Sequence, residues 1–266
     1  MRGFVRGVEQ AVAAWQARPP DAHVLLLLDF DGTLVEFSED PFRVTLPPGR
    51  QELLQLLVAD PSFTVGIVSG RRITDMRERT AIGHAAFYAG LHGLEIEGPG
   101  VKFMHHAASV ASPTIGVLER QVREAVRELR GVVVEDKGLS MVLHVRGASK
   151  PDRLHARTRF QALAAPYLND GLLRVQPGDE MVELLPNIDW TKGDAVMYLL
   201  RHVQAQKKPR VWPIYIGDDA TDEDAFEAIG DGGLTIAVSN RAAGASLRLQ
   251  DPAAVEAFLR SMLATN

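Results

Sequence analysis

The sequence predicts an α/β fold in which a doubly wound parallel sheet forms the core and a smaller α+β domain is inserted into it. At both ends of the chain, short runs that are apolar throughout alternate with helix-like segments. This pattern is typical of a parallel sheet covered by helices on both faces. In the middle of the chain, polar residues recur at every second position, which is typical of a sheet with one face in water.

The core elements follow from the hydrophobic periodicity and from the residues that interrupt it. Apolar residues at three- and four-residue spacing predict an amphipathic helix over residues 4–15, ended by Pro19 and Pro20. The remaining core elements are, in order, strand 24–28, helix 48–58, strand 63–68, helix 72–82, helix 193–203, strand 211–216, helix 222–229 and strand 234–238.

The inserted domain has a pattern of its own. We expect a helix over residues 114–129, two strands in GVVVEDKG and LSMVLHVRG, a helix over residues 151–168, and two strands in LLRVQPGDEMVELLP that join at Pro177 and Gly178. The expected larger domain therefore consists of residues 1–108 and 183–266, and the smaller one of residues 109–182.

Composition excludes several classes of protein. The formal net charge is −5 and no block of Lys or Arg stands out, so we expect no nucleic-acid partner. The absence of cysteine excludes disulfides, thiolate zinc sites and a cysteine nucleophile. No apolar run approaches the ~20 residues of a membrane span, and Glu9 and Gln10 interrupt the N-terminal segment where a signal peptide is apolar. We expect a soluble, cytoplasmic protein with no membrane contact.

Two carboxylates follow the first strand. Asp29 and Asp31 come directly after VLLLL, with Gly32 to allow a sharp turn and Thr33 to add a hydroxyl. Reactive groups of open α/β sheets gather at the carboxyl ends of the strands, so one carboxylate can attack phosphorus while the other handles protons. On its own, an acidic pair of this spacing is more often a plain turn. A calcium loop is excluded for two reasons. In an EF-hand the glycine comes five residues after the start of the loop, later than Gly32 does here, and no buried strand precedes the loop.

Two further segments offer groups that bind an anion. Ser69, Gly70 and Arg71 follow the apolar run FTVGIV and precede a helix, so a hydroxyl and backbone amides are available for a phosphate group. Lys192 starts a helix that Thr191 can cap, and its ammonium group there neutralises a transferring phosphoryl group. Taken singly, a serine such as Ser69 is more often a helix cap, and side chains such as Arg71 and Lys192 are more often solvated surface charges.

A second acidic cluster follows the strand VWPIYI. Thr221 and Asp224 have the spacing of a capping box, whereas Asp218 and Asp219 have no such structural explanation and lie where a hard cation needs oxygen ligands. All four segments are expected at one sheet edge. Together they supply what phosphoryl transfer through an aspartyl-phosphate requires.

In this order the four segments resemble the motifs of haloacid dehalogenase superfamily phosphatases, and the insertion is similar to their type C2 cap. LHGLE, GDEMVELLP and GDDATDEDAF resemble the trehalose-6-phosphate phosphatases, so the resemblance covers essentially the whole chain. It implies a Rossmann-like core and a Mg²⁺ ion held by Asp29, the backbone carbonyl of Asp31 and Asp218, with Asp219 and Asp222 behind them. The activity it implies is hydrolysis of trehalose 6-phosphate to trehalose and phosphate.

Substrate choice is expected to lie in the inserted domain, which we expect to close over the sugar phosphate. By strand alternation Ser140, His144 and Arg146 share one face, and Glu183 lies in the returning strand. A solvated sheet face is the plain alternative. The resemblance implies that Lys137, His144, Arg146 and Glu183 contact the sugar.

Two other functions stay open. The first is a phosphatase for another glycosyl phosphate, such as sucrose phosphate or a glycosyl phosphoglycerate, because the core motifs would be the same. The second is a non-catalytic partner of a sugar synthase, although clustered carboxylates repel one another without a cation. For an active enzyme, a trehalose-6-phosphate synthase is the candidate protein partner.

Overall fold

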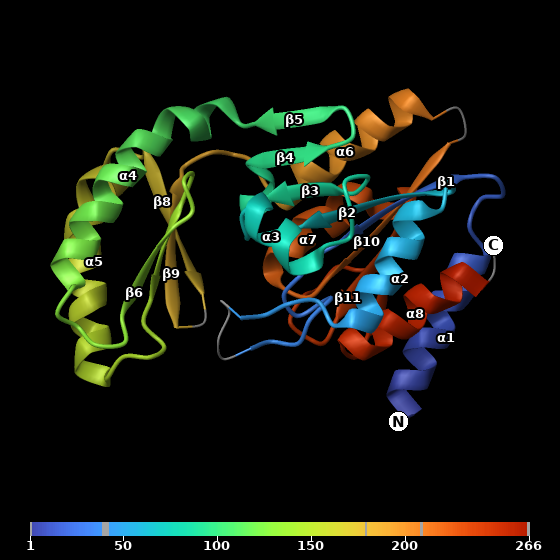
Figure 1. Ribbon diagram of the computed structural model, residues 1–266, viewed down its shortest axis with the longest axis horizontal. Coiled ribbons are helices and arrows are strands. Elements are labelled where there is room, and N and C mark those ends of the chain that lie inside the picture. The colour runs from blue at the N-terminus through green and yellow to red at the C-terminus, as the bar shows by residue number, and fades with distance from the viewer. Residues whose placement is uncertain (1, 39–42, 179, 208–209, 265–266) are drawn as a thin grey trace. The chain divides into compact units, whose positions relative to one another are not determined.

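The computed structural model describes residues 2–38, 43–178, 180–207 and 210–264 and divides the chain into two compact units (Figure 1). Unit 1 comprises Met1–Phe103 and Trp190–Asn266, and unit 2 comprises Met104–Asp189. Within the described residues, unit 1 contains an eight-stranded, mostly parallel sheet and unit 2 a four-stranded antiparallel sheet. The predicted α/β class is confirmed, and the expected insertion, residues 109–182, falls inside unit 2.

The unit 1 sheet runs in the spatial order β12, β11, β10, β1, β2, β3, β4 and β5. These strands are, in that order, Leu247–Leu249, Leu234–Val238, Val211–Gly217, His23–Leu28, Phe63–Val68, Phe87–Gly90, Glu95–Gly98 and Val101–Met104. From β12 to β3 neighbouring strands are parallel, and β4 is antiparallel to β3. The helices of unit 1 are α1 (Arg2–Gln16), α2 (Pro48–Ala59), α3 (Ile73–Thr80), α6 (Lys192–Gln206), α7 (Ala220–Ile229) and α8 (Pro252–Ala264), with 3-10 turns at Leu91–Gly93 and Gly230–Gly232.

Burial on both faces explains why β1 is apolar at every position. Val24, Leu26 and Leu28 pack in one core with buried residues of α1, α2 and α8. Leu25 and Leu27 point to the opposite core, formed with α6 and α7. Figure 1 shows these two groups of helices on opposite sides of the sheet. Because successive strand residues face opposite ways, a strand between two helical layers has no position for a polar side chain.

Unit 2 packs two helices against one face of its sheet. The strands are β6 (Val133–Asp136), β7 (Met141–His144), β9 (Met181–Pro186) and β8 (Leu173–Gly178), in that spatial order, and the helices are α4 (His106–Val126) and α5 (Lys150–Asn169). Met141 and Leu143 pack against buried residues of both helices. The predicted start of the first helix, directly after Pro113, is wrong: α4 begins at His106 and continues through the proline. Proline removes one backbone donor, and here the helix persists because its buried face continues on both sides.

Among the helices that the structure describes, none combines the length and the apolar character needed to cross a bilayer.

Candidate active site

The four segments that carry chemical groups meet at one edge of the unit 1 sheet. β1 lies between β10 and β2 and is parallel to both. The residues that follow these strands, Asp29, Asp218 and Ser69, therefore share the carboxyl edge of the sheet, and all three are buried. Lys192 reaches the same place from the first turn of α6 and is also buried.

A tight turn after β1 brings the β1 and β10 carboxylates together. Gly32 has a φ of +82°, and a Cβ added to it would collide with the Asp218 carboxylate and with the Phe37 ring. Glycine is required here, because it alone adopts this conformation without strain and leaves room for both neighbours. Thr33 is fully buried, and its hydroxyl lies 3.5 Å from Asp218 Oδ1.

Lys192 supplies the positive charge of the site. Thr191 and Asp194 form a capping box at the start of α6, as the sequence predicts for Thr191. Lys192 Nζ donates to Asp29 Oδ1 (2.9 Å) and to Asp222 Oδ1 (2.7 Å). Burial alone would lower the pKa of Lys192, but Asp222 and Asp29 outweigh burial and raise it well above its ordinary value. The side chain therefore keeps its charge inside the protein.

Asp222 organises the residues around it. Its Oδ1 accepts from Lys192 and from the Tyr215 hydroxyl (2.6 Å). Its Oδ2 accepts from the backbone N–H groups of Asp218 (2.8 Å) and Asp219 (3.0 Å). Four donors thus saturate one buried carboxylate, which fixes Lys192 and the backbone after β10 relative to each other.

The helix that follows β10 begins earlier than its capping pattern suggests. Asp219 is the N-cap of α7 and forms a capping box with Asp222, while the Thr221 backbone N–H (2.8 Å) and hydroxyl (2.6 Å) both donate to Asp219 Oδ1. The predicted pairing of Thr221 with Asp224 is therefore wrong. Asp219 caps the helix, a role that the sequence did not assign to it. Asp219 and Asp222 also have capping-box spacing, so the sequence offers two possible capping pairs, and the one with threonine is not used.

Three buried carboxylates are grouped closely enough to hold a metal ion. Asp29, Asp218 and Asp222 each offer an oxygen, and these atoms lie within 4.8 Å of one another. Asp218 Oδ2 is buried without a hydrogen-bond partner, whereas both oxygens of Asp222 already accept two hydrogen bonds. An oxygen-only donor set suits a hard cation. The residues fit such an ion, with Asp29 and Asp218 as the carboxylates that have capacity to bind it.

The electrostatics of the carboxylates agree with this fit. Burial raises the pKa of Asp218 to about 7, and the charges of Asp222 and Asp219 contribute to the rise. Burial also raises the pKa of Asp29 well above its usual range, although Lys192 opposes the shift. Crowded negative charge of this kind favours either proton uptake or a bound cation.

Asp31 points to a different partner. Arg71 Nε and Nη2 donate to the two oxygens of Asp31 at 2.6 and 2.7 Å, and Arg71 Nη1 donates to Asp75 Oδ2 at 3.1 Å. Paired, two-pronged contacts of this type are strong and orient the carboxylate. The structure thus brings together two residues that the sequence assigned to separate tasks, proton transfer for Asp31 and phosphate binding for Arg71.

The segment after β2 is held by side chains rather than by a serine cap. Ser69 Oγ accepts from the Arg71 backbone N–H at 3.3 Å, and α3 begins only at Ile73, with Arg72 at its N-cap position. The Ile73 N–H is satisfied by Glu95 Oε1 at 2.8 Å. Ser69 as a helix cap, the plain alternative, is therefore wrong, and Glu95 performs that task from β4.

His92 is a site neighbour for which the sequence predicted no role. Leu91, His92 and Gly93 have φ of +53°, +58° and +95°, a left-handed conformation that is uncommon for residues other than glycine. The His92 N–H donates to the Ser69 carbonyl at 3.0 Å, and a Cβ on Gly70 would lie 2.7 Å from His92 Nε2. The motif LHGLE contains this turn, but its residue types do not predict that Leu91 and His92 adopt a left-handed backbone conformation. Such strain is concentrated at functional sites.

The sugar-contact residues predicted in unit 2 form a buried polar cluster. Glu183 is almost fully buried, and its Oε1 accepts from the Ser140 hydroxyl at 2.7 Å and from Lys137 Nζ at 3.3 Å. Glu183 lies opposite Val142 in the β7–β9 pair, on the face away from Met141 and the apolar core. Lys137, Ser140 and Glu183 therefore come together.

The other two predicted sugar contacts, His144 and Arg146, lie at the end of β7 and just after it. His144 Nε2 is 2.8 Å from Glu135 Oε2 on β6, and burial would raise the pKa of Glu135, but His144 and Lys137 outweigh burial and lower it. Arg146 follows β7, where its backbone carbonyl accepts from Arg153 at 2.7 Å. His144 thus continues the polar face, and the Arg146 backbone carbonyl accepts from Arg153 just after the strand.

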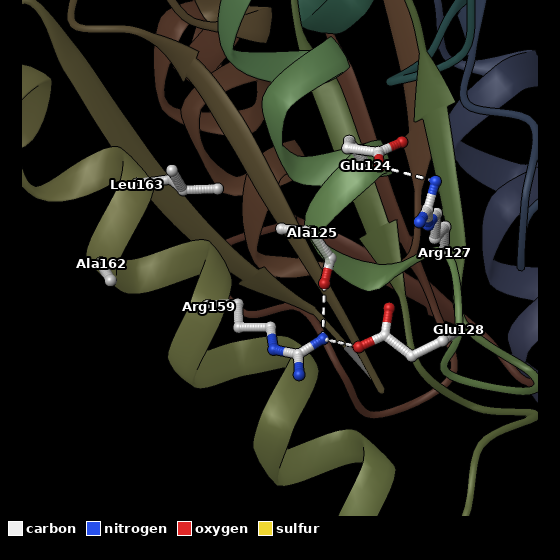
Figure 2. Close-up of a pocket in the computed structure, with 7 residues that line it drawn as sticks. All are labelled: Glu124, Ala125, Arg127, Glu128, Arg159, Ala162 and Leu163. Atoms are coloured by element: carbon white, nitrogen blue, oxygen red, sulfur yellow. Dashed lines mark hydrogen bonds and ion pairs between the residues drawn. The ribbon is translucent and has the colours of Figure 1, made fainter.

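A hollow of about 700 Å³ lies elsewhere on unit 2, between α4 and α5. Figure 2 shows that its arginines point at acidic neighbours, Arg127 at Glu124 (2.8 Å) and Arg159 at Glu128. Since its charges neutralise one another, the hollow offers no net charge to a ligand. It is lined by Glu124, Ala125, Arg127, Glu128, Arg159, Ala162 and Leu163.

Comparisons with known proteins give consistent results. The sequence model of the trehalose-phosphatase family matches residues 27–252. The trehalose-phosphate phosphatase of Mycobacterium ulcerans (strain Agy99) is 37% identical over 252 residues, which cover 90% of this chain and 62% of that protein. The chain thus spans about three fifths of the length of this curated relative.

Two solved structures share the fold. The C-terminal domain of the Candida albicans trehalose-6-phosphate phosphatase superimposes with a TM-score of 0.77 at 21% identity, covering 97% of this chain and 96% of that one. The C-terminal domain of the Candida albicans trehalose synthase regulatory protein gives 0.67 at 13% identity, covering 94% and 97%. At these identities the likeness concerns the fold alone.

Proposed function

The chain belongs to the trehalose-phosphatase family, and on that premise we propose that it hydrolyses trehalose 6-phosphate to trehalose and inorganic phosphate. One observation carries the proposal: the buried contact of Asp29 with Lys192, beside a second carboxylate, Asp218, whose Oδ2 has no hydrogen-bond partner. A buried nucleophile, its counter-charge and a cation ligand are the groups that transfer of a phosphoryl group requires.

In the proposed reaction an Asp29 oxygen attacks phosphorus, and the bond between phosphorus and the sugar oxygen breaks. Asp31 gives its proton to that oxygen, so that the sugar leaves as an alcohol. Water then attacks the phosphorus of the aspartyl-phosphate, Asp31 takes the proton from this water, and Asp29 leaves as a carboxylate. Lys192 stabilises negative charge at Asp29 throughout.

Arg71 is proposed to connect substrate arrival to the availability of Asp31. While Arg71 donates to both Asp31 oxygens, neither oxygen is free to carry a proton toward the sugar. A phosphate group near Ser69 and Gly70 competes for the guanidinium, because phosphate accepts the same two-pronged contact. Arg71 thus remains a proposed phosphate ligand, and Asp31 becomes available for proton transfer only when substrate is bound.

The cation is proposed to be Mg²⁺, held by Asp29, the Asp31 carbonyl and Asp218, with Asp219 and Asp222 fixing the surrounding backbone. When bound, Mg²⁺ neutralises charge on the transferring phosphoryl group. Asp222 is not proposed as a ligand, because four donors already saturate it.

Unit 2, the proposed cap, is assigned the choice of sugar. Lys137, Ser140 and Glu183 offer one cationic donor, one hydroxyl and one carboxylate in a single cluster, and His144 continues its polar face. Arg146, which follows the same strand as His144, is proposed as a further sugar contact. Sugar hydroxyls both donate and accept, so such a mixed cluster suits them. We propose that closure on the substrate excludes bulk water.

Two alternatives are weighed against this function. Hydrolysis of another glycosyl phosphate would use the same core residues, and only unit 2 argues against it. A non-catalytic role is suggested by the regulatory protein of Candida albicans, whose domain has this fold. Asp29, Asp31, Lys192 and Asp218 favour catalysis, because a binding surface gains nothing from buried, mutually repelling carboxylates.

Phosphate release from a panel of sugar phosphates, with Mg²⁺ and with EDTA, tests the proposal. We expect the highest kcat/KM with trehalose 6-phosphate and no turnover in EDTA. Asp29→Asn should abolish turnover, and Asp31→Asn should reduce it by about 10² to 10⁴. A preference for another glycosyl phosphate would reassign the substrate, and a fully active Asp29→Asn variant would overturn the mechanism.

We also propose that the enzyme works in the cytoplasm beside a trehalose-6-phosphate synthase, the class of enzyme that forms its substrate. Cell fractionation and co-purification with a synthase test the two parts. Recovery in another compartment contradicts the first, and no association at cellular concentrations contradicts the second.

A further inference from the structure

Arg241 places a positive charge next to the carboxylate oxygen that has no hydrogen-bond partner. It lies in the loop between β11 and β12, and its Nη1 is 3.9 Å from Asp218 Oδ2. The guanidinium also stacks on the Phe37 ring, 3.9 Å from the ring centroid. The Arg241 side chain is 49% exposed and that of Asp218 is 2% exposed. Arg241 thus reaches a buried carboxylate from the solvent side.

The loop that carries Arg241 is fixed on both sides. Arg248 donates to the carbonyls of Ser239 and of Ala242 (2.9 Å for the second). The Ala243 N–H donates to Glu223 Oε1 at 2.7 Å. Because the backbone before and after Arg241 is tied down and its guanidinium stacks on Phe37, the side chain is held at both of its ends.

Phe37 completes the arrangement. Its ring lies so close to Gly32 that a Cβ there would collide with both the ring and the Asp218 carboxylate. The edge of the Phe37 ring therefore lies beside Asp218, and its face holds the guanidinium by a cation–π contact. Phe37 and Arg241 come from distant segments of the chain and meet at Asp218 Oδ2. Among the described residues, this buried oxygen accepts no hydrogen bond.

We propose that Arg241 competes with the divalent cation for Asp218 and so lowers the affinity of the site for the ion. The inference rests on the cation part of the proposed function. A guanidinium 3.9 Å from Asp218 Oδ2 neutralises that oxygen in part, and a divalent cation bound there repels the guanidinium. Binding of the ion therefore requires Arg241 to move outward along the Phe37 ring, and this displacement costs free energy that a neutral residue does not impose.

The size of the effect follows from the exposure of Arg241. Because half of the side chain is in water, the interaction is screened well below its value in the interior. We expect removal of the charge to tighten cation binding by roughly three- to tenfold. Charge-conserving replacement by lysine should have a smaller effect, since the ammonium group still repels the ion.

Calorimetric titration of the full chain with Mg²⁺, in a buffer without phosphate, tests the proposal independently of activity. The variants are Arg241→Gln and Arg241→Lys, with Arg260→Gln as the matched control. Arg260 has a similarly exposed side chain, 56%, and pairs with Glu256 on α8. It reports the effect of losing one positive charge that pairs with Glu256 and not with Asp218. Thermal melting in EDTA and in Mg²⁺ verifies that each variant is folded and gives a second measure of cation binding.

The expected result is a lower Kd for Mg²⁺ in Arg241→Gln, a Kd near that of the unaltered chain in Arg241→Lys and in Arg260→Gln, and a larger rise of Tm with Mg²⁺ in Arg241→Gln. An unchanged or higher Kd in Arg241→Gln overturns the proposal, as does an Arg241→Lys variant that binds as tightly as Arg241→Gln. If neither the unaltered chain nor any variant binds Mg²⁺, the cation part of the proposed function itself fails. That outcome is distinguishable from equal binding by all four proteins, which refutes the role of Arg241 alone.

Discussion

Replacing Asp222 by Asn changes one atom at the centre of the site. The Asp222 carboxylate accepts four hydrogen bonds, two on each oxygen, from Lys192, Tyr215 and the backbone N–H groups of Asp218 and Asp219. An asparagine amide has one oxygen and one NH₂ group. Whichever way the amide is turned, its NH₂ group faces two donors, so two of the four hydrogen bonds are lost.

The loss of these contacts should destabilise the folded protein. Hydrogen bonds to charged groups contribute about 1.5–3 kcal/mol each, and removal of one partner from a buried ion pair costs about 3–5 kcal/mol. Two terms reduce the loss: Lys192 keeps its contact with Asp29, and the repulsion that helps to raise the pKa of Asp218 disappears. We expect a net loss of about 3 kcal/mol, which lowers Tm by roughly 6 to 12 °C.

Thermal and denaturant unfolding in EDTA, followed by phosphate release in Mg²⁺, measures both effects. The control is Asp224→Asn, because Asp224 is exposed on the same helix and undergoes the same substitution. Its Tm should remain within about 2 °C of the unaltered protein, since surface changes cost at most about 0.5 kcal/mol. Asp222→Asn should also lose activity on the order of 10²-fold, because Asp222 no longer holds both Lys192 and the backbone of Asp218 and Asp219 in place. An Asp222→Asn variant with unchanged Tm and turnover would refute the role given to this carboxylate.

Three further predictions concern single residues. In EDTA, the contribution of Asp218 to stability should fall as pH rises from about 4 to 7, by at most about 1.4 kcal/mol per pH unit, because burial raises the pKa of Asp218 from 3.8 to about 7 and the folded state binds the extra proton. Asp218→Asn should reduce the slope by this contribution, while the raised pKa of Asp29 leaves a slope of the same sign; equal slopes in both proteins contradict the prediction. Gly32→Ala should cost about 1–3 kcal/mol and abolish Mg²⁺ binding measured by calorimetry, since its methyl group displaces Asp218; normal binding would show that the turn tolerates a side chain. Glu183→Gln should raise KM for trehalose 6-phosphate more than it lowers kcat, because the charge that pairs with Lys137 is lost and an NH₂ group replaces one carboxylate oxygen of the cluster; a pure kcat effect in steady-state kinetics would remove Glu183 from sugar recognition.

Much of the fold was predictable because burial on both faces leaves a strong mark in the sequence. Strand β2 was predicted with its observed bounds, and β1 begins one residue earlier than predicted, at His23. By contrast, β4 (Glu95–Gly98) carries two glutamates and β12 (Leu247–Leu249) has three residues. Strands at or near a sheet edge need fewer apolar residues and can be short, so neither leaves a periodic pattern long enough to predict.

The candidate active site was also predictable only in part. Asp29, Ser69 and Asp218 were predictable because each follows a strand, and parallel strands bring their carboxyl ends together. The partners of these residues were not. The pairing of Asp31 with Arg71 and the packing of His92 on Gly70 depend on distances between segments far apart in the chain, which no local pattern encodes.

In the proposed mechanism Asp29 becomes covalently phosphorylated. Enzyme mixed with trehalose 6-phosphate and Mg²⁺, quenched in acid within one turnover and digested, is analysed by mass spectrometry for the peptide that contains Asp29. We expect this peptide to carry the mass of one phosphoryl group, on Asp29, in the unaltered enzyme and not in Asp29→Asn. Phosphate released during the first turnover without any phosphorylated peptide at any quench time, or with the phosphoryl group on another residue, would contradict it.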